Sequence, residues 1–263
     1  MSKRKKIIVL FCVAAIIFFL PLIYIRQHYA VPIIMYHSVN PNAQPKNRLA
    51  VTDQTFARQM HFLKRHHYNV IPLEELGFLI REKKKIPPKT IVISFDDGNK
   101  DNYTYAFPVL KKYNLPAAVF MIIQEIGRNV GDKLNWEEIK EMQDSGLVTF
   151  GSHCIGPEPL INIKSEDVIR REIFDSKKIL ELNLNTKVNI FSYPEGRFNA
   201  RIKQLVQEAG YQVAVATNPG RGFPNDDIFA LKRLRISANS DNLLIFWVET
   251  SGYYNFMREW KRK

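Results

Sequence analysis

The stretch TIVISFDDGNKDNY, from Thr90 to Tyr103, places two adjacent carboxylates directly after a segment rich in β-branched residues. TIVISF predicts a buried strand, and an ionised carboxylate is costly to bury unless it is paired or bound to a cation. Neighbouring residues of a regular strand face opposite ways, so Asp96 and Asp97 can serve one site only if the strand breaks there. Gly98 permits that break. The stretch therefore predicts a strand with a chemical site at its carboxyl end.

Short apolar segments alternate with helical patterns along the rest of the chain. The expected strands are Val31–Tyr36, Thr90–Phe95, Ala117–Ile123, Leu147–Phe150, Val188–Tyr193, Tyr211–Thr217 and Phe229–Ile236. At least six alternations of strand and helix predict a parallel sheet. So many units in one domain favour a β/α barrel, with an open doubly wound sheet as the alternative. In either fold, the site lies at the carboxyl ends of the strands.

Polar residues stand at several of these expected strand ends. His37, the pair Asp96 and Asp97, His153 and Glu195 each follow a different strand. A single histidine in a loop, or an Asp-Asp-Gly turn, is most often structural. The presence of all these polar residues at the same end of the predicted sheet favours a functional site. Imidazole and carboxylate are ordinary ligands of zinc or a similar ion, so Asp97 with His153 forms a partial metal site. A divalent ion lowers the pKa of water, and the other carboxylate can then act as general base.

The amino terminus predicts a membrane anchor. Four basic residues precede Ile7–Ile25, 19 residues without a charge, which would make a helix of roughly 28 Å, close to the thickness of a bilayer core. Basic residues before the span keep that end cytoplasmic, so the rest is expected outside the membrane. A cleaved signal peptide is the alternative. We therefore expect residues 1–30 to be an anchor or signal segment and 31–263 to be one catalytic domain.

The composition adds little about partners. The net charge of +12 predicts a solvated basic surface that attracts anionic envelope polymers or lipid headgroups. No basic-aromatic motif indicates nucleic-acid binding. The two cysteines, Cys12 and Cys154, form no disulfide framework.

Several motifs carry a resemblance to a known family. SFDDG, with the apolar helix and PAAVFMI after it, resembles the polysaccharide deacetylase family, also called the NodB homology domain or carbohydrate esterase family four. GSH at residues 151–153 resembles the start of its metal-binding histidine motif, and SYPEG at 192–196 resembles its Tyr-Pro-x-Gly loop. VPIIMYHS at 31–38 resembles the opening of a permuted subgroup that acts on poly-N-acetylglucosamine. The resemblance covers roughly residues 31 to 238 and implies a distorted β/α barrel with fewer than eight complete units.

The resemblance also implies roles for individual residues. Asp96 matches the general base, Asp97 and His153 match ligands of a divalent metal, and His37 matches the general acid. The backbone near Tyr193 matches the oxyanion-binding position, which needs amide hydrogens aimed at developing negative charge. The implied reaction is hydrolysis of N-acetyl groups on an amino-sugar polysaccharide outside the cytoplasmic membrane.

Two departures from the family pattern bear on this expectation. A second histidine is expected four or five residues after His153, and Pro157 and Glu158 stand there instead. Either Glu158 is an oxygen ligand, or water fills the place, or no metal binds. The arginine that braces the base aspartate in many members is also missing, with Ser192 in its place. Family members with the Tyr-Pro-x-Gly loop often lack this arginine.

Two other functions remain open on the sequence. A relative without the second histidine ligand can serve as a non-catalytic glycan-binding or accessory domain. A glycosidase needs two carboxyl groups on either side of one bond, about 5 to 9 Å apart. Asp96 with Glu195 is the pair that could supply them.

Overall fold

The computed structural model describes residues 4–5, 29–44, 47–128, 132–217 and 225–261. The predicted anchor, Ile7–Ile25, lies outside the described residues. Within the described ranges, no helix has both the length and the apolar character needed to cross a membrane.

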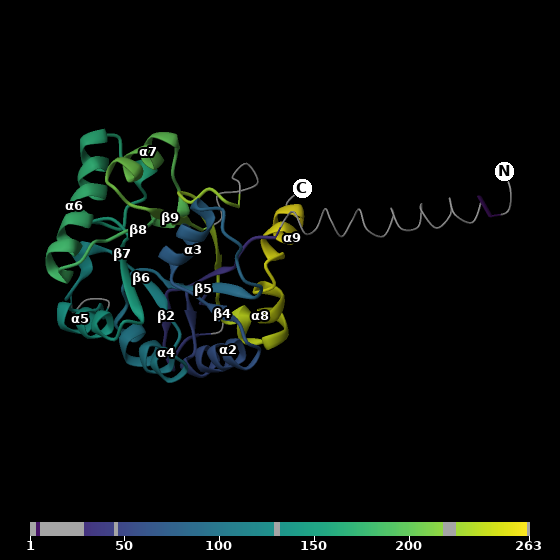
Figure 1. Cartoon of the computed structure of the whole chain (residues 1–263). Helices are drawn as coiled ribbons and strands as arrows, with labels where there is room; N and C mark the ends of the chain where they lie inside the picture. The colour runs from purple at the N-terminus through teal and green to yellow at the C-terminus, as the bar shows by residue number, and fades with distance from the viewer. Residues whose placement is uncertain (1–3, 6–28, 45–46, 129–131, 218–224, 262–263) are drawn as a thin grey trace.

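Seven parallel strands close into a barrel (Figure 1). In spatial order these are β1 (Ile33–Tyr36), β10 (Leu231–Arg235), β9 (Val213–Ala216), β8 (Ile190–Ser192), β7 (Val148–Ser152), β6 (Ala117–Met121) and β5 (Thr90–Phe95). The pairing of β1 with β5 closes the ring, with Ile33 opposite Val92. The expected barrel of fewer than eight units is therefore confirmed, and the open sheet is excluded.

Three short strands lie outside the ring. β4 (Asn69–Val70) pairs with the start of β5. β2 (Ser38–Val39) and β3 (Ala50–Val51) form a separate two-stranded sheet. β2 comes directly after the residue that follows β1, so this small sheet lies beside the carboxyl ends of the barrel strands.

Helices surround the barrel (Figure 1). They are α2 (Asp53–Arg65), α3 (Leu73–Arg81), α4 (Phe107–Tyr113), α5 (Trp136–Asp144), α6 (Glu166–Leu184), α7 (Ala200–Glu208), α8 (Leu243–Glu249) and α9 (Tyr254–Lys261). α5 begins with a capping box, because the side chains of Asn135 and Glu138 each accept the other's backbone N–H. It satisfies amide groups that the first turn leaves unpaired.

The alternation of side chains along the strands produces two apolar layers. Inside the barrel, Ile33, Val92 and Phe120 pack with the apolar residues of α3. Their sequence neighbours face outward into the larger core between strands and helices. Because the period of a strand is two residues, this register also decides which polar side chains point inward at the carboxyl ends.

Candidate active site

Asp96 continues the inward-facing positions of β5 and is buried, at 3% exposed. Its two carboxylate oxygens accept hydrogen bonds from Arg233 of β10, at 2.6 and 2.7 Å. Arg233 is completely buried and also donates to the Ser192 hydroxyl, at 2.8 Å. Burial raises the pKa of Asp96, but the Arg233 guanidinium and two nearby histidines more than offset this and hold it at about 2. Asp96 is therefore ionised at neutral pH.

Arg233 corrects one expectation from the sequence. The arginine brace that the SYPEG loop lacks is supplied by another strand, and Ser192 accepts a hydrogen bond from that same arginine. The signal in the sequence was a basic residue at an inward position of a predicted strand, LKRLR. Only the closure of the barrel shows that β10 lies beside β1 and brings Arg233 to Asp96.

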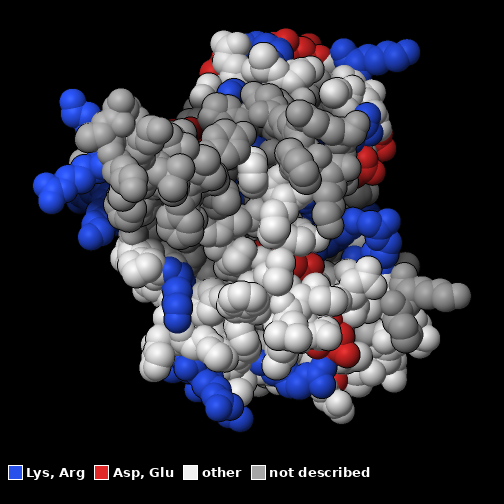
Figure 2. All heavy atoms as spheres, turned by 90° about the vertical axis from the view of Figure 1, so that its right-hand side faces the viewer, with Lys and Arg blue, Asp and Glu red and all other residues white. Residues whose placement is uncertain are grey.

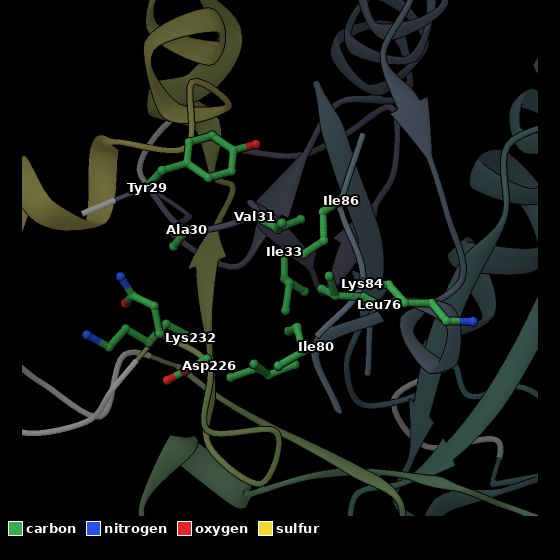
Figure 3. Close-up of a pocket in the computed structure, with 12 residues that line it drawn as sticks. Tyr29, Ala30, Val31, Ile33, Leu76, Ile80, Lys84, Ile86, Asp226 and Lys232 are labelled. Carbon is green, nitrogen blue, oxygen red and sulfur yellow. The ribbon is translucent and has the colours of Figure 1, made fainter. Parts of the chain in front are cut away.

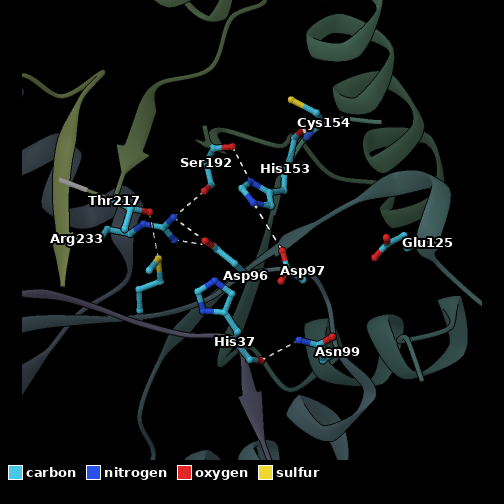
Figure 4. Close-up of polar contacts among 12 residues, drawn as sticks. His37, Asp96, Asp97, Asn99, Glu125, His153, Cys154, Ser192, Thr217 and Arg233 are labelled. Atoms are coloured by element: carbon cyan, nitrogen blue, oxygen red, sulfur yellow. Dashed lines mark hydrogen bonds and ion pairs between the residues drawn. The ribbon is translucent and has the colours of Figure 1, made fainter. Parts of the chain in front are cut away.

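Asp97 leaves the strand in a left-handed conformation. Its φ is +70°, and that of Gly98 is +60°. A side chain on residue 98 would place its Cβ 2.4 Å from the Met121 Cε, so glycine is needed there on two counts. Lys133 holds the turn, donating to the Asp97 carbonyl at 3.1 Å and to Asn99 Oδ1 at 3.0 Å. The predicted break after β5 is therefore present and turns both carboxylates to the same end of the barrel (Figure 4).

His153 follows β7 and lies beside Asp97. Its Nδ1 is 2.8 Å from the carbonyl oxygen of Ser192, which can only accept, so Nδ1 carries a proton. In the neutral ring, Nε2 then has a free lone pair, and it lies 3.8 Å from Asp97 Oδ1. An imidazole held through its other nitrogen, next to a carboxylate, is the usual arrangement of metal ligands. These two side chains fit as two ligands of a divalent ion.

The third predicted ligand does not join them. Glu158 is exposed, and its carboxylate accepts a hydrogen bond from Asn162 at 2.7 Å. Pro157 is exposed as well. The residues that the structure describes contain no group of three or more histidine, cysteine or acidic side chains placed to hold one metal. An ion at Asp97 and His153 would have to complete its coordination with water or substrate.

His37 follows β1 and reaches the same end of the barrel. Its carbonyl oxygen accepts hydrogen bonds from Asn102 at 2.8 Å and from Asn99 at 3.1 Å. Asn102 opens a π-helical turn, Asn102–Ala106, a rare structure that often marks functional sites. The Nδ1 of His37 is buried and has no hydrogen-bond partner among the described residues.

Burial lowers the pKa of His37 below its ordinary value. The two aspartates oppose this shift, while the nearby guanidinium and the second imidazole add to it. Figure 4 shows the His37 ring directed toward Asp96, with Asp97 and His153 close by. His37 is thus a neutral imidazole at neutral pH, beside a fixed negative charge.

Tyr193 is not placed as the sequence suggested. Its side chain packs in the outer core and donates to the Phe229 carbonyl at 3.0 Å. Its backbone N–H is already bonded to the Val215 carbonyl, at 3.1 Å, because it extends the pairing of β8 with β9. That amide cannot donate to an oxyanion in this arrangement. The next residue, Pro194, has no amide hydrogen.

The carboxylate pair needed for a glycosidase is not formed. The side chain of Glu195 is 61% exposed and lies within ion-pair distance of Arg197, at 3.3 Å. Asp96 is engaged inside the barrel by Arg233. Glu195 thus faces solvent while Asp96 faces the interior, so the two do not flank a common space.

A cavity of about 510 Å³ lies at the other end of the barrel (Figure 3). Its lining includes Ile33 and Leu231 at the starts of β1 and β10, and Leu76 and Ile80 of α3. Sites in parallel barrels form at the carboxyl ends of the strands. The cavity is therefore separate from the polar cluster and is not the candidate active site.

Comparisons with known proteins agree with this geometry. The sequence model of the polysaccharide deacetylase family matches residues 83–214. The Bacillus subtilis (strain 168) protein YxkH is 35% identical over 208 residues, covering 78% of this chain and 71% of that one. The poly-β-1,6-N-acetyl-D-glucosamine N-deacetylase of Staphylococcus epidermidis is 30% identical over 206 residues, covering 74% and 71%. The Streptococcus pyogenes deacetylase PplD, solved with acetate, superimposes with a TM-score of 0.72 at 27% identity, covering 88% and 97%.

The barrel and the Asp–His cluster at its carboxyl end form a site suited to hydrolysis with a bound divalent ion. The chain belongs to the polysaccharide deacetylase family. The resemblance drawn from SFDDG, GSH and SYPEG is confirmed, as is the prediction of a carbohydrate deacetylase.

Proposed function

We propose that this protein removes N-acetyl groups from a polymer of β-1,6-linked N-acetylglucosamine, outside the cytoplasmic membrane. The observation that carries the proposal is the convergence of His37, Asp96, Asp97 and His153 from three different strand ends. The named activity of the staphylococcal relative supports the choice of polymer, and the acetate bound to PplD fits the expected product. The 19 uncharged residues after a basic amino terminus support the location.

The reaction hydrolyses an amide. A water oxygen bonds to the acetyl carbon, the carbon–nitrogen bond breaks, and the amine leaves with an added proton. A divalent ion held by Asp97 and His153 would supply Lewis-acid activation of water. Asp96, ionised and fixed by Arg233, is placed to accept a proton from that water. Its low pKa makes it a weak base, so its alignment matters more than its basicity.

His37 completes the proton balance. The half-buried His37 lies at the carboxyl end of the barrel beside the aspartates, and an imidazole can protonate a leaving amine. Because burial favours neutral His37, it must gain a proton before it can donate one. The nearby carboxylates stabilise the protonated ring. If the proton that Asp96 takes from water passes to His37, and His37 then gives it to the leaving amine, Asp96 ends the cycle ionised and His37 ends it neutral, as both began.

The test is acetate release from β-1,6-linked N-acetylglucosamine oligomers by the full chain in detergent, with and without a chelator. We expect release that a chelator suppresses and that Asp96→Asn abolishes. Glu158→Gln is the matched control, because this exposed carboxylate lies away from the cluster. Oligomer binding without acetate release would refute the proposal in favour of a glycan-binding domain. Shortening of the oligomers would favour a glycosidase.

A further inference from the structure

α8 presents an unusually apolar surface. Leu244, Ile245, Trp247 and Val248 are 74%, 45%, 55% and 36% exposed, while only Phe246 of its apolar residues is buried. Among the residues that the structure describes, ten large hydrophobic side chains are exposed, and five of them lie in α8 and α9. Soluble domains seldom gather exposed apolar side chains in this way unless the surface binds a partner.

The chain enters the domain beside this surface. Ala30 N–H donates to the Gly252 carbonyl, at 2.9 Å, in the turn between α8 and α9. The rings of Tyr29 and Tyr253 meet edge to face, 5.5 Å apart. A Cβ on Gly252 would lie 2.2 Å from the Tyr29 ring, so the glycine allows this close approach. The first residues of the domain are therefore fastened to the α8–α9 turn.

Chain length then places this turn near the proposed anchor. Four residue steps separate Ile25, the last residue of the apolar segment, from Tyr29. Four steps span at most about 14 Å. The headgroup layer on each side of a bilayer is roughly 5 to 8 Å thick. If Ile7–Ile25 spans the bilayer, the α8–α9 turn lies within or just above the headgroups.

Charge near α8 suits an anionic membrane. An apolar groove of about 490 Å³ adjoins the start of α8, and Leu243 lines it. Arg65 and His66 line the same groove, as does Arg58, whose guanidinium is ion-paired with Asp241. Figure 2 faces this side of the molecule and shows Lys and Arg side chains along the lower edge of a largely uncharged area. Apolar side chains bordered by cations are typical of surfaces that lie at anionic lipid interfaces.

We infer that the exposed face of α8 docks on the surface of an anionic lipid bilayer, next to the point where the amino-terminal segment enters it. The inference rests on the anchoring in the proposed function. Its consequence is that the catalytic barrel is held in one orientation on the membrane instead of swinging on a tether. Trp247 then lies at the interface, the position that tryptophan prefers.

Tryptophan quenching in vesicles tests this. The full chain is reconstituted in vesicles of phosphatidylcholine and phosphatidylglycerol whose acyl chains carry bromine. The difference between wild type and Trp247→Phe isolates the Trp247 emission, and we expect most of it to be quenched. Trp136→Phe is the matched control, since α5 lies on the opposite side of the barrel (Figure 1). Unquenched Trp247 in a protein that floats with the vesicles would overturn the inference.

Charge substitution gives a second test. Leu244→Asp combined with Val248→Asp should abolish the quenching of Trp247, whereas Leu182→Asp, at an equally exposed leucine of α6, should not. Circular dichroism confirms that the variants fold. A chain that fails to float refutes the anchor and this inference together, while acetate release still reports separately on catalysis. Trp247 emission that depends on protein concentration in detergent would indicate a second copy on this face, and would overturn the lipid assignment.

Discussion

Replacing Arg233 with methionine removes the cation that holds Asp96 in the barrel. Methionine keeps a similar length but donates none of the three hydrogen bonds that Arg233 makes to Asp96 and Ser192. Removing one partner of a buried ion pair costs about 3 to 5 kcal/mol, because the other charge stays buried and uncompensated. The lowered pKa of Asp96 gives a second, independent value for the stabilisation of its charged form. A fall from 3.8 to about 2 corresponds to about 2 kcal/mol net of the cost of burial.

The pH dependence has a definite sign. The pKa of Asp96 is depressed in the folded protein, so its stabilising contribution is present above about pH 4 and is lost as the pH falls toward 2. The free energy of unfolding of Arg233→Met should therefore lie about 3 kcal/mol below that of wild type at neutral pH. The difference should shrink across that acid range.

Denaturant unfolding of the full chain in detergent, followed by circular dichroism, measures this. Arg235→Met, on the same strand but without a carboxylate ion pair among the described contacts, should cost much less. Adding Asp96→Asn to Arg233→Met removes the uncompensated charge and should restore part of the stability. A variant as stable as wild type, or a double variant no better than the single one, would refute the assignment of Arg233 as the partner of Asp96.

Four further outcomes can be checked. Tyr193→Phe removes a hydrogen bond to a backbone carbonyl, so the free energy of unfolding should fall by about 1 kcal/mol, while kcat for acetate release stays unchanged. A large fall in kcat would instead give that hydroxyl a role in catalysis. Pro157→His supplies the missing imidazole, and metal analysis should show tighter binding than wild type; equal binding would mean that residue 157 is out of reach. Asn102→Ala removes the shorter of the two hydrogen bonds to the His37 carbonyl and leaves the one from Asn99. Misplacement of about 1 Å can lower kcat by about 100-fold, which steady-state kinetics would show with little change in KM. Burial raises the pKa of Glu249 to about 7, so the free energy of unfolding of wild type should fall by on the order of 3 kcal/mol as the pH rises from 4.5 to 7. Glu249→Gln should remove this pH dependence of the unfolding free energy, and an unchanged pH dependence would contradict the assignment.

Part of the site could be predicted because it depends on local pattern. The apolar segment before Asp96 predicts a strand, and the glycine after Asp97 predicts the turn that brings both carboxylates to one end. The repeated order of strand and helix predicts parallel pairing, which gathers the carboxyl ends of all strands at one face. The closeness of Asp97 and His153 follows from those two facts alone.

The rest depended on which strands become neighbours and which side chains face inward. Arg233 is more than 130 residues from Asp96 in the chain, and only the closed ring brings them together. The amide of Tyr193 is engaged because β9 lies next to β8. The loop after β7 turns Glu158 to solvent, away from His153. The exposed face of α8 is likewise a tertiary result, since its sequence, LLIFWVE, predicts burial.

The amino-acid sequence by itself determined the strands, the turn at Asp97 and the chemical type of the site, because hydrophobic period and backbone conformation act over a few residues. Tertiary structure alone decided the partner of Asp96, the engagement of the Tyr193 amide and the exposure of Glu158 and α8. Those features arise from contacts between distant segments, and a contact of that kind leaves no periodic trace in the chain.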